Sequence, residues 1–78
     1  MKEFLEKLVS YIIDPQSAFE VREENTEGLT TFTVFAPSQE VGKIIGKEGK
    51  VISAIRNLCR IKASREQKRV LIKVEQAS

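Results

Sequence analysis

The stretch "VGKIIGKEGKVISAIRNL", residues 41–58, combines three glycines with three nearby lysines in an otherwise apolar pattern that suits helices. Glycine inside a helix costs roughly 1 kcal/mol relative to alanine, so its recurrence indicates that bare backbone is needed there. Bare backbone beside ammonium groups is an arrangement that suits a phosphate group. The glycines are Gly42, Gly46 and Gly49, and the lysines are Lys43, Lys47 and Lys50.

Two nucleotide-binding patterns can be compared with these residues and both fail. A Walker loop would need a glycine at Ile44 and a hydroxyl side chain at Val51 around the Gly49–Lys50 pair. A dinucleotide fingerprint would need a glycine two residues before Gly46, where Ile44 stands again. The stretch is therefore neither a nucleotide-hydrolysing loop nor a dinucleotide-binding turn.

The pattern that fits is a Gly-x-x-Gly turn at residues 46–49 between two helices. Without side chains at its ends, such a turn lets a sugar-phosphate backbone approach, and the next helix offers free N–H groups. Lysines inside and beside the turn would contact phosphates, and apolar side chains before it would contact unstacked bases. The expected apolar residues are Val41, Ile44 and Ile45. The glycines alone would also fit a tight turn, and Gly42 fits helix packing or ligand approach equally.

The first forty residues are expected to support this turn. Apolar residues recur at helical spacing from Glu3 to Ile13, and Asp14–Pro15 should end that helix. The segment "AFEVREE" alternates apolar and charged residues and runs toward Gly28, which predicts a strand entering a turn. The segment "LTTFTVFAP" is rich in strand formers and ends at Pro37. A helix and a two-stranded hairpin are therefore predicted.

The second half predicts two helices and a last strand. Ser38 is the expected N-cap of a short helix over 39–45, with Glu40 in its first turn, and a longer helix begins at Lys50. After "SREQK", the segment "RVLIKVE" alternates as a half-buried strand does. The second and last strands should pair in parallel across the helical connection. We expect one α+β domain over residues 1–78, α-β-β-α-α-β, with a three-stranded mixed sheet and helices on one face.

Charge divides the chain into two halves. Residues 1–40 hold three lysines and arginines against eight acids, a net charge of −5, and residues 41–78 hold ten against three, a net charge of +7. A basic half suits nucleic acid or an anionic membrane face, although an ordinary solvated surface explains charge alone equally well. Arg56 and Arg60 are expected to face solvent, where they contact phosphate or serve solubility.

Catalytic and metal-binding residues are scarce. The sequence contains no histidine and only one cysteine, Cys59, and its carboxylates have no apolar pocket in which a pKa would rise. We therefore predict no enzyme activity, no metal and no cofactor, and expect Cys59 to be a buried small side chain. A lone cysteine, no apolar run of about 20 residues and acids at the N-terminus favour a cytoplasmic location.

The residues "VGKIIGKEGKVISAIRNL" and the predicted element order resemble the KH domain family in its type II, prokaryotic form, over essentially the whole chain. The resemblance implies single-stranded RNA binding, with Gly46, Lys47, Glu48 and Gly49 clamping the backbone. It also implies association with a second copy or with a larger KhpB (Jag-type) partner, and a role as RNA chaperone or post-transcriptional regulator. The residues implied to line or support a groove for about four nucleotides are Val41, Gly42, Ile44, Ile45, Val51 and Ile52.

One residue departs from the family pattern. Glu48 puts a negative charge in the turn, where a basic or polar residue is more usual, and this predicts weak RNA binding. The alternative function is a protein-interaction module that never binds nucleic acid. Aromatic stacking is not the expected mode of binding, because the aromatic residues precede the turn and fall mostly on predicted core faces.

An apolar stripe extends the buried side of the long helix. Ala54, Leu58 and Ile61 recur at three- and four-residue spacing, beside the arc that a sheet would cover. A stripe of this kind predicts a partner interface, although a wide core face would give the same pattern.

Overall fold

The computed structural model describes residues 1–77. Its element order is helix, strand, strand, helix, helix, strand, with a single 3₁₀ turn between the last two helices, as predicted. The elements are α1 (Lys2–Ser10), β1 (Glu20–Thr26), β2 (Leu29–Ala36), α2 (Ser38–Ile45), the 3₁₀ turn η1 (Lys47–Gly49), α3 (Lys50–Arg65) and β3 (Arg69–Gln76).

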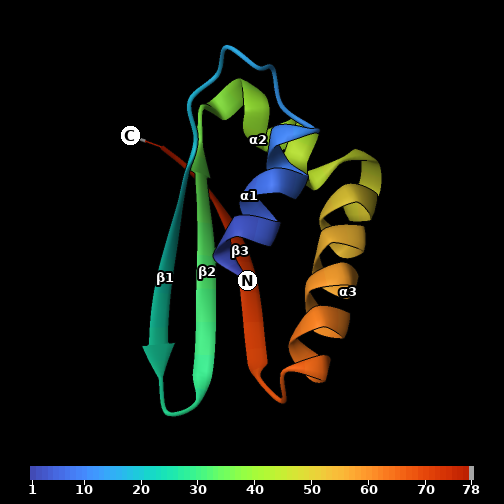
Figure 1. Ribbon diagram of the computed structural model, residues 1–78. Coiled ribbons are helices and arrows are strands. Elements are labelled where there is room, and N and C mark those ends of the chain that lie inside the picture. The colour runs from blue at the N-terminus through green and yellow to red at the C-terminus, as the bar shows by residue number, and fades with distance from the viewer. Residues whose placement is uncertain (78) are drawn as a thin grey trace.

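The three strands form one mixed sheet in the order β1-β2-β3. β1 and β2 pair antiparallel with Val21 opposite Val34, and β2 and β3 pair in parallel with Phe32 opposite Ile72. Glu27 and Gly28 both have positive φ angles in the two-residue connection of the hairpin, which is typical of a type I′ turn. The predicted hairpin and the predicted parallel pairing are both confirmed. Figure 1 shows the helices on one side of this sheet.

The core lies between the sheet and the helices. Inward positions alternate along β2, because successive strand side chains point to opposite faces, so Phe32 and Val34 are buried while Thr31 and Thr33 are half-buried on the other face. Cys59 is fully buried as expected, and burial raises the pKa of its thiol, which suits a packing role. The other buried apolar residues are Leu5, Val9, Ile13, Val21, Ala36, Ile44, Ile52, Ile55, Ala63 and Ile72.

Two predicted helix ends differ from the structure. α1 ends at Ser10 instead of Ile13, because the N–H groups of Ile12 and Ile13 both bond to the carbonyl of Val9 and the chain tightens before Pro15. Ser38 is the first residue of α2 and not its N-cap. Pro37 is the N-cap, and its carbonyl accepts the N–H groups of residues 40 and 41.

Glu40 connects the start of α2 to the segment after α1. Its side chain is only 3% exposed, and its two carboxylate oxygens have different partners. Oε2 accepts the backbone N–H of Asp14 at 2.9 Å, and Oε1 accepts Lys43 Nζ at 3.1 Å. These bonds compensate the desolvation of the carboxylate, so Glu40 fixes where α2 sits.

No helix within residues 1–77 is long and apolar enough to cross a membrane.

Candidate nucleic-acid interface

The turn at residues 46–49 has an unusual backbone. Gly46, Glu48 and Gly49 have φ angles of +78°, +57° and +75°, so three of the four turn residues lie in the left-handed half of φ space. The turn itself therefore requires glycine at both of its ends, so the two glycines do not by themselves indicate a ligand. Glu48 adopts the same region without being glycine, which is uncommon for a long side chain.

Gly46 has a second requirement in the packing beneath the turn. A Cβ at this position would lie 2.3 Å from Cγ2 of Val51 and 2.8 Å from its backbone nitrogen, both far inside van der Waals contact. Val51 is half-buried against the core, so it cannot move away freely. The chain thus enters α3 directly over Val51, and Gly46 holds the turn close to the start of that helix.

Cations surround the turn, but they are not equivalent. Lys43 forms an ion pair with the buried Glu40 at 3.1 Å, so part of its charge is already neutralised. Lys47 and Lys50 are exposed and have no carboxylate within ion-pair distance in the described part of the chain. The N–H of Lys50, the first residue of α3, already donates to the carbonyl of Lys47, so only the N–H groups after it in the first turn of the helix lack a helical partner. Two of the three predicted lysines are therefore free to meet an anion.

Some of the apolar residues around the turn are buried beneath the surface, and others are exposed on it. Ile44 is fully buried, so it supports the surface from below and cannot itself touch a base. Ile52 is likewise buried at 6% exposure. Ile45 is 38% exposed, and Val41 and Val51 are half-buried. The predicted apolar lining is therefore corrected to Ile45 with the edges of Val41 and Val51.

Gly42 lies on the open side of α2. A Cβ built there would meet no atom within 4 Å, and the residue is exposed. Close packing against another helix, one of the two explanations left open by the sequence, is therefore wrong. The other explanation, approach by a ligand backbone, stays a prediction.

Replacing Gly42 by alanine should separate stability from binding. The new methyl group has free space and an ordinary helical backbone, so the free energy of unfolding should rise by about 0.5–1 kcal/mol. If a ligand backbone lies against this position, RNA affinity should fall at the same time. Thermal denaturation and fluorescence anisotropy with a labelled single-stranded RNA measure the two effects. An alanine variant that is more stable and binds equally well would remove Gly42 from the site.

Arg56, which was expected either to contact phosphate or to serve solubility, lies farther along α3. Its side chain is exposed, and its Nε donates a long hydrogen bond of 3.3 Å to the carbonyl oxygen of Ile72 on β3. β3 is an edge strand, so this carbonyl would otherwise be free. Arg56 thus connects α3 to β3, and its contact with phosphate stays a prediction.

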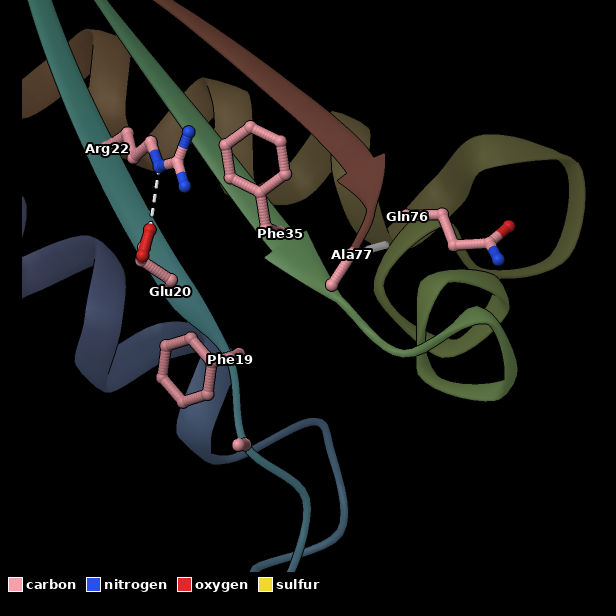
Figure 2. A pocket seen from close by; sticks show the side chains of 7 residues that line it. Phe19, Glu20, Arg22, Phe35, Gln76 and Ala77 are labelled. Atoms are coloured by element: carbon pink, nitrogen blue, oxygen red, sulfur yellow. Dashed lines mark hydrogen bonds and ion pairs between the residues drawn. The ribbon is translucent and has the colours of Figure 1, made fainter.

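A separate hollow at the other face of the sheet was not predicted. Figure 2 shows Phe19, Phe35 and Arg22 around it, with the Arg22 guanidinium 4.6 Å from the centre of the Phe35 ring. Arg22 is also paired with Glu20 at 2.6 Å, which occupies the cation and brings a negative charge to the rim. The sequence signal was the alternation in β1 and β2, which sends Arg22 and Phe35 to the same face. This hollow is poorly suited to phosphate.

The apolar stripe on α3 is open to solvent. Leu58 is 46% exposed, Ile61 is 56% exposed, and Ala54 is also exposed. Leu58 and Ile61 line a shallow hollow of about 310 Å³ beside Phe4 of α1, whose ring lies 5.2 Å from Lys62 Nζ. A core role for these three residues is therefore wrong within the isolated chain.

A Gly-x-x-Gly turn between the last two helices, an α-β-β-α-α-β order and a mixed three-stranded sheet together define the type II KH fold. The sequence model of the KhpA/KhpB KH domain matches residues 2–74, so the chain belongs to this family. It is similar to proteins named RNA-binding protein KhpA. That of Chlamydia trachomatis is 34% identical over 95% of both chains, and that of Clostridium acetobutylicum is 30% identical over 95% of this chain and 99% of the relative. These names agree with the prediction of a binding protein and not an enzyme.

Proposed function

We propose that this protein binds single-stranded RNA and that the turn at residues 46–49 clamps the RNA backbone. The observation that carries the proposal is the exposed turn with Lys47 and Lys50 unpaired, directly before a helix that contains no acidic residue from 50 to 65. The names of the relatives, RNA-binding protein KhpA, support the ligand class. Phosphates would contact the two lysines and the N–H groups at the start of α3, and bases would rest against Ile45.

Such binding should be weak and dependent on salt. One turn contacts about two or three phosphates, which predicts a slope of about −1.4 to −2 in a plot of log affinity against log salt concentration for single strands. Duplex RNA should bind less well, because its paired bases cannot rest against Ile45. An affinity that does not change between low and high salt would contradict a phosphate clamp.

Glu48 should set the strength of the clamp. Replacing it by lysine removes a negative charge and adds a positive one at an exposed position, so RNA affinity should rise by roughly fivefold, about 1 kcal/mol. Glu48→Gln is the matched control, because it keeps the side-chain size and the left-handed backbone strain and should give an intermediate affinity. Anisotropy titrations of the three proteins test this order. Equal affinities would show that Glu48 lies outside the reach of the RNA.

We also propose that the protein acts as a dimer. The exposed stripe of Ala54, Leu58 and Ile61 would be covered by the same stripe of a second copy across a twofold axis, as an isologous contact requires. A KhpB (Jag-type) partner is the alternative occupant, and the family name that joins KhpA with KhpB supports it. Either assembly would place two RNA-binding turns in one particle, which strengthens weak binding without new contacts.

In the cell the proposed role is that of an RNA chaperone or post-transcriptional regulator in the cytoplasm. Weak contacts with the backbone would let the protein bind many transcripts. Crosslinking in cells, followed by sequencing of the attached RNA, tests this role. Recovery of partner proteins but no RNA would instead favour a protein-interaction module.

A further inference from the structure

A second concave surface lies at the end of α3 farthest from the turn. It has a volume of about 600 Å³ and opens between the last two turns of α3, the connection to β3 and the first residues of β3. Three of its lining residues are cations, and no carboxylate lines it within the described residues. One of the three, Lys68, forms an exposed ion pair with Glu66 at 3.7 Å, so part of its charge is neutralised. The lining residues are Leu29, Arg60, Ala63, Ser64, Gln67, Lys68, Arg69, Val70 and Leu71.

The shape of this hollow is fixed by the end of α3. Gln67 adopts a left-handed φ of +56°, the N–H of Lys68 bonds to the carbonyl of Ala63 at 2.9 Å, and that of Gln67 bonds to Ser64 at 3.1 Å. This is the Schellman pattern of helix termination. These bonds fix the connection that leads from α3 to Lys68 and Arg69, which line the hollow together with Arg60 and have exposed side chains.

A polar side of α3 runs from the turn toward the hollow. At 100° per residue, Arg56, Arg60 and Ser64 share one side of the helix with Ser53 and Asn57, and all five are exposed. The stripe of Ala54, Leu58 and Ile61 lies about 130° away around the helix from Arg60. A dimer built on that stripe would therefore leave the polar side open.

The hollow and the turn lie at opposite ends of α3. α3 has 16 residues, so it is about 24 Å long, and the hollow lies at its far end. A phosphate held by Lys47 or Lys50 cannot also reach Lys68 or Arg69. The two cationic regions must contact different phosphates of a bound strand.

We propose that this hollow, here called the α3–β3 hollow, is a second contact site for the same RNA strand, and this inference rests on the proposed function. Arg60, Lys68 and Arg69 hold phosphates by charge. A base fits against Val70, which is half-buried on the helix side of β3, and the Gln67 amide and Ser64 hydroxyl offer hydrogen bonds to its edge. The RNA footprint is therefore longer than the roughly four nucleotides expected of one groove.

The test compares two lengths of oligouridylate, 4 and 12 nucleotides, on two triple variants. One replaces Arg60, Lys68 and Arg69 by glutamine. The control replaces Lys2, Lys7 and Lys73 by glutamine, which removes the same net charge from exposed residues outside the hollow. The hollow variant should bind the 12-mer roughly tenfold more weakly than the control, with a salt slope smaller in magnitude by about 2. Both variants should bind the 4-mer equally.

The outcomes separate this site from the turn. Equal binding of the 12-mer by the two triple variants would overturn the α3–β3 hollow as an RNA site, and so would a loss of 4-mer binding confined to the hollow variant. Bivalency of a dimer affects both variants alike and cannot imitate the expected difference. Failure of the proposed function would show differently, as 4-mer binding that survives aspartate at Lys47 and Glu48. Binding of an acidic peptide at the hollow in place of the 12-mer would also overturn the proposal.

Discussion

Replacing Lys47 and Glu48 together by aspartate is expected to abolish RNA binding while leaving the fold intact. The change converts the only cation inside the turn into an anion, so the turn repels phosphate at two adjacent positions. Affinity for a short single strand should fall by at least about 30-fold, which corresponds to 2 kcal/mol. Both side chains are exposed, and aspartate adopts the left-handed backbone of residue 48 more readily than glutamate, so stability should change by less than about 1 kcal/mol.

The chain offers a closely matched control for this variant. Lys2 and Glu3 form the same dipeptide in an exposed position at the start of α1, away from the turn. Their double replacement by aspartate changes the net charge equally and should leave RNA affinity almost unchanged. Equal loss in both double variants would assign the effect to net charge alone. Full binding by the Lys47/Glu48 variant would remove the turn from the site.

Ile61→Asp is expected to convert a dimer into a folded monomer. Ile61 is 56% exposed in the single chain, so the isolated fold loses little packing, but a charge buried in a twofold contact would lack a partner. Light scattering should give twice the 8.8-kDa chain mass for the parent and the single-chain mass for the variant. Affinity for an RNA that spans two turns should fall through lost bivalency, whereas affinity for a tetranucleotide should not change.

Ile61→Leu is the conservative control, because it keeps volume and apolar character and should remain dimeric. An aspartate variant that unfolds would mean that Ile61 stabilises the single chain, against its exposure. A parent that remains monomeric at high concentration, with no partner recovered from lysate, would contradict the interface.

Much of the fold could be predicted because local patterns agreed with one another. The alternation in β2 and β3 fixed their inward faces, and Gly28 and Pro37 marked the ends of the hairpin's second strand. The turn was recognisable because two glycines framed a lysine between helical patterns. Its position between α2 and α3 could be predicted because the sequence on either side has a helical pattern.

What could not be predicted depends on contacts between distant residues. The sequence placed Glu40 in the first turn of α2 but did not indicate that it is buried, because its partner, the N–H of Asp14, is 26 residues away. Helical spacing gave Val41, Ile44 and Ile45 as an apolar group, but only the packing of α2 shows that Ile44 is the buried one. The demand for glycine at position 46 likewise comes from Val51 beneath it.

The most direct test of the account follows the backbone amide signals of the protein by nuclear magnetic resonance while a tetranucleotide of single-stranded RNA is added. The RNA is proposed to contact the turn, so the largest shifts should fall on residues 42–52, including Gly46 and Gly49. Amides around Arg22 and Phe35 on the open sheet face should change little. Shifts concentrated on that face, or none at residues 46–49 under conditions where the RNA binds, would contradict the account.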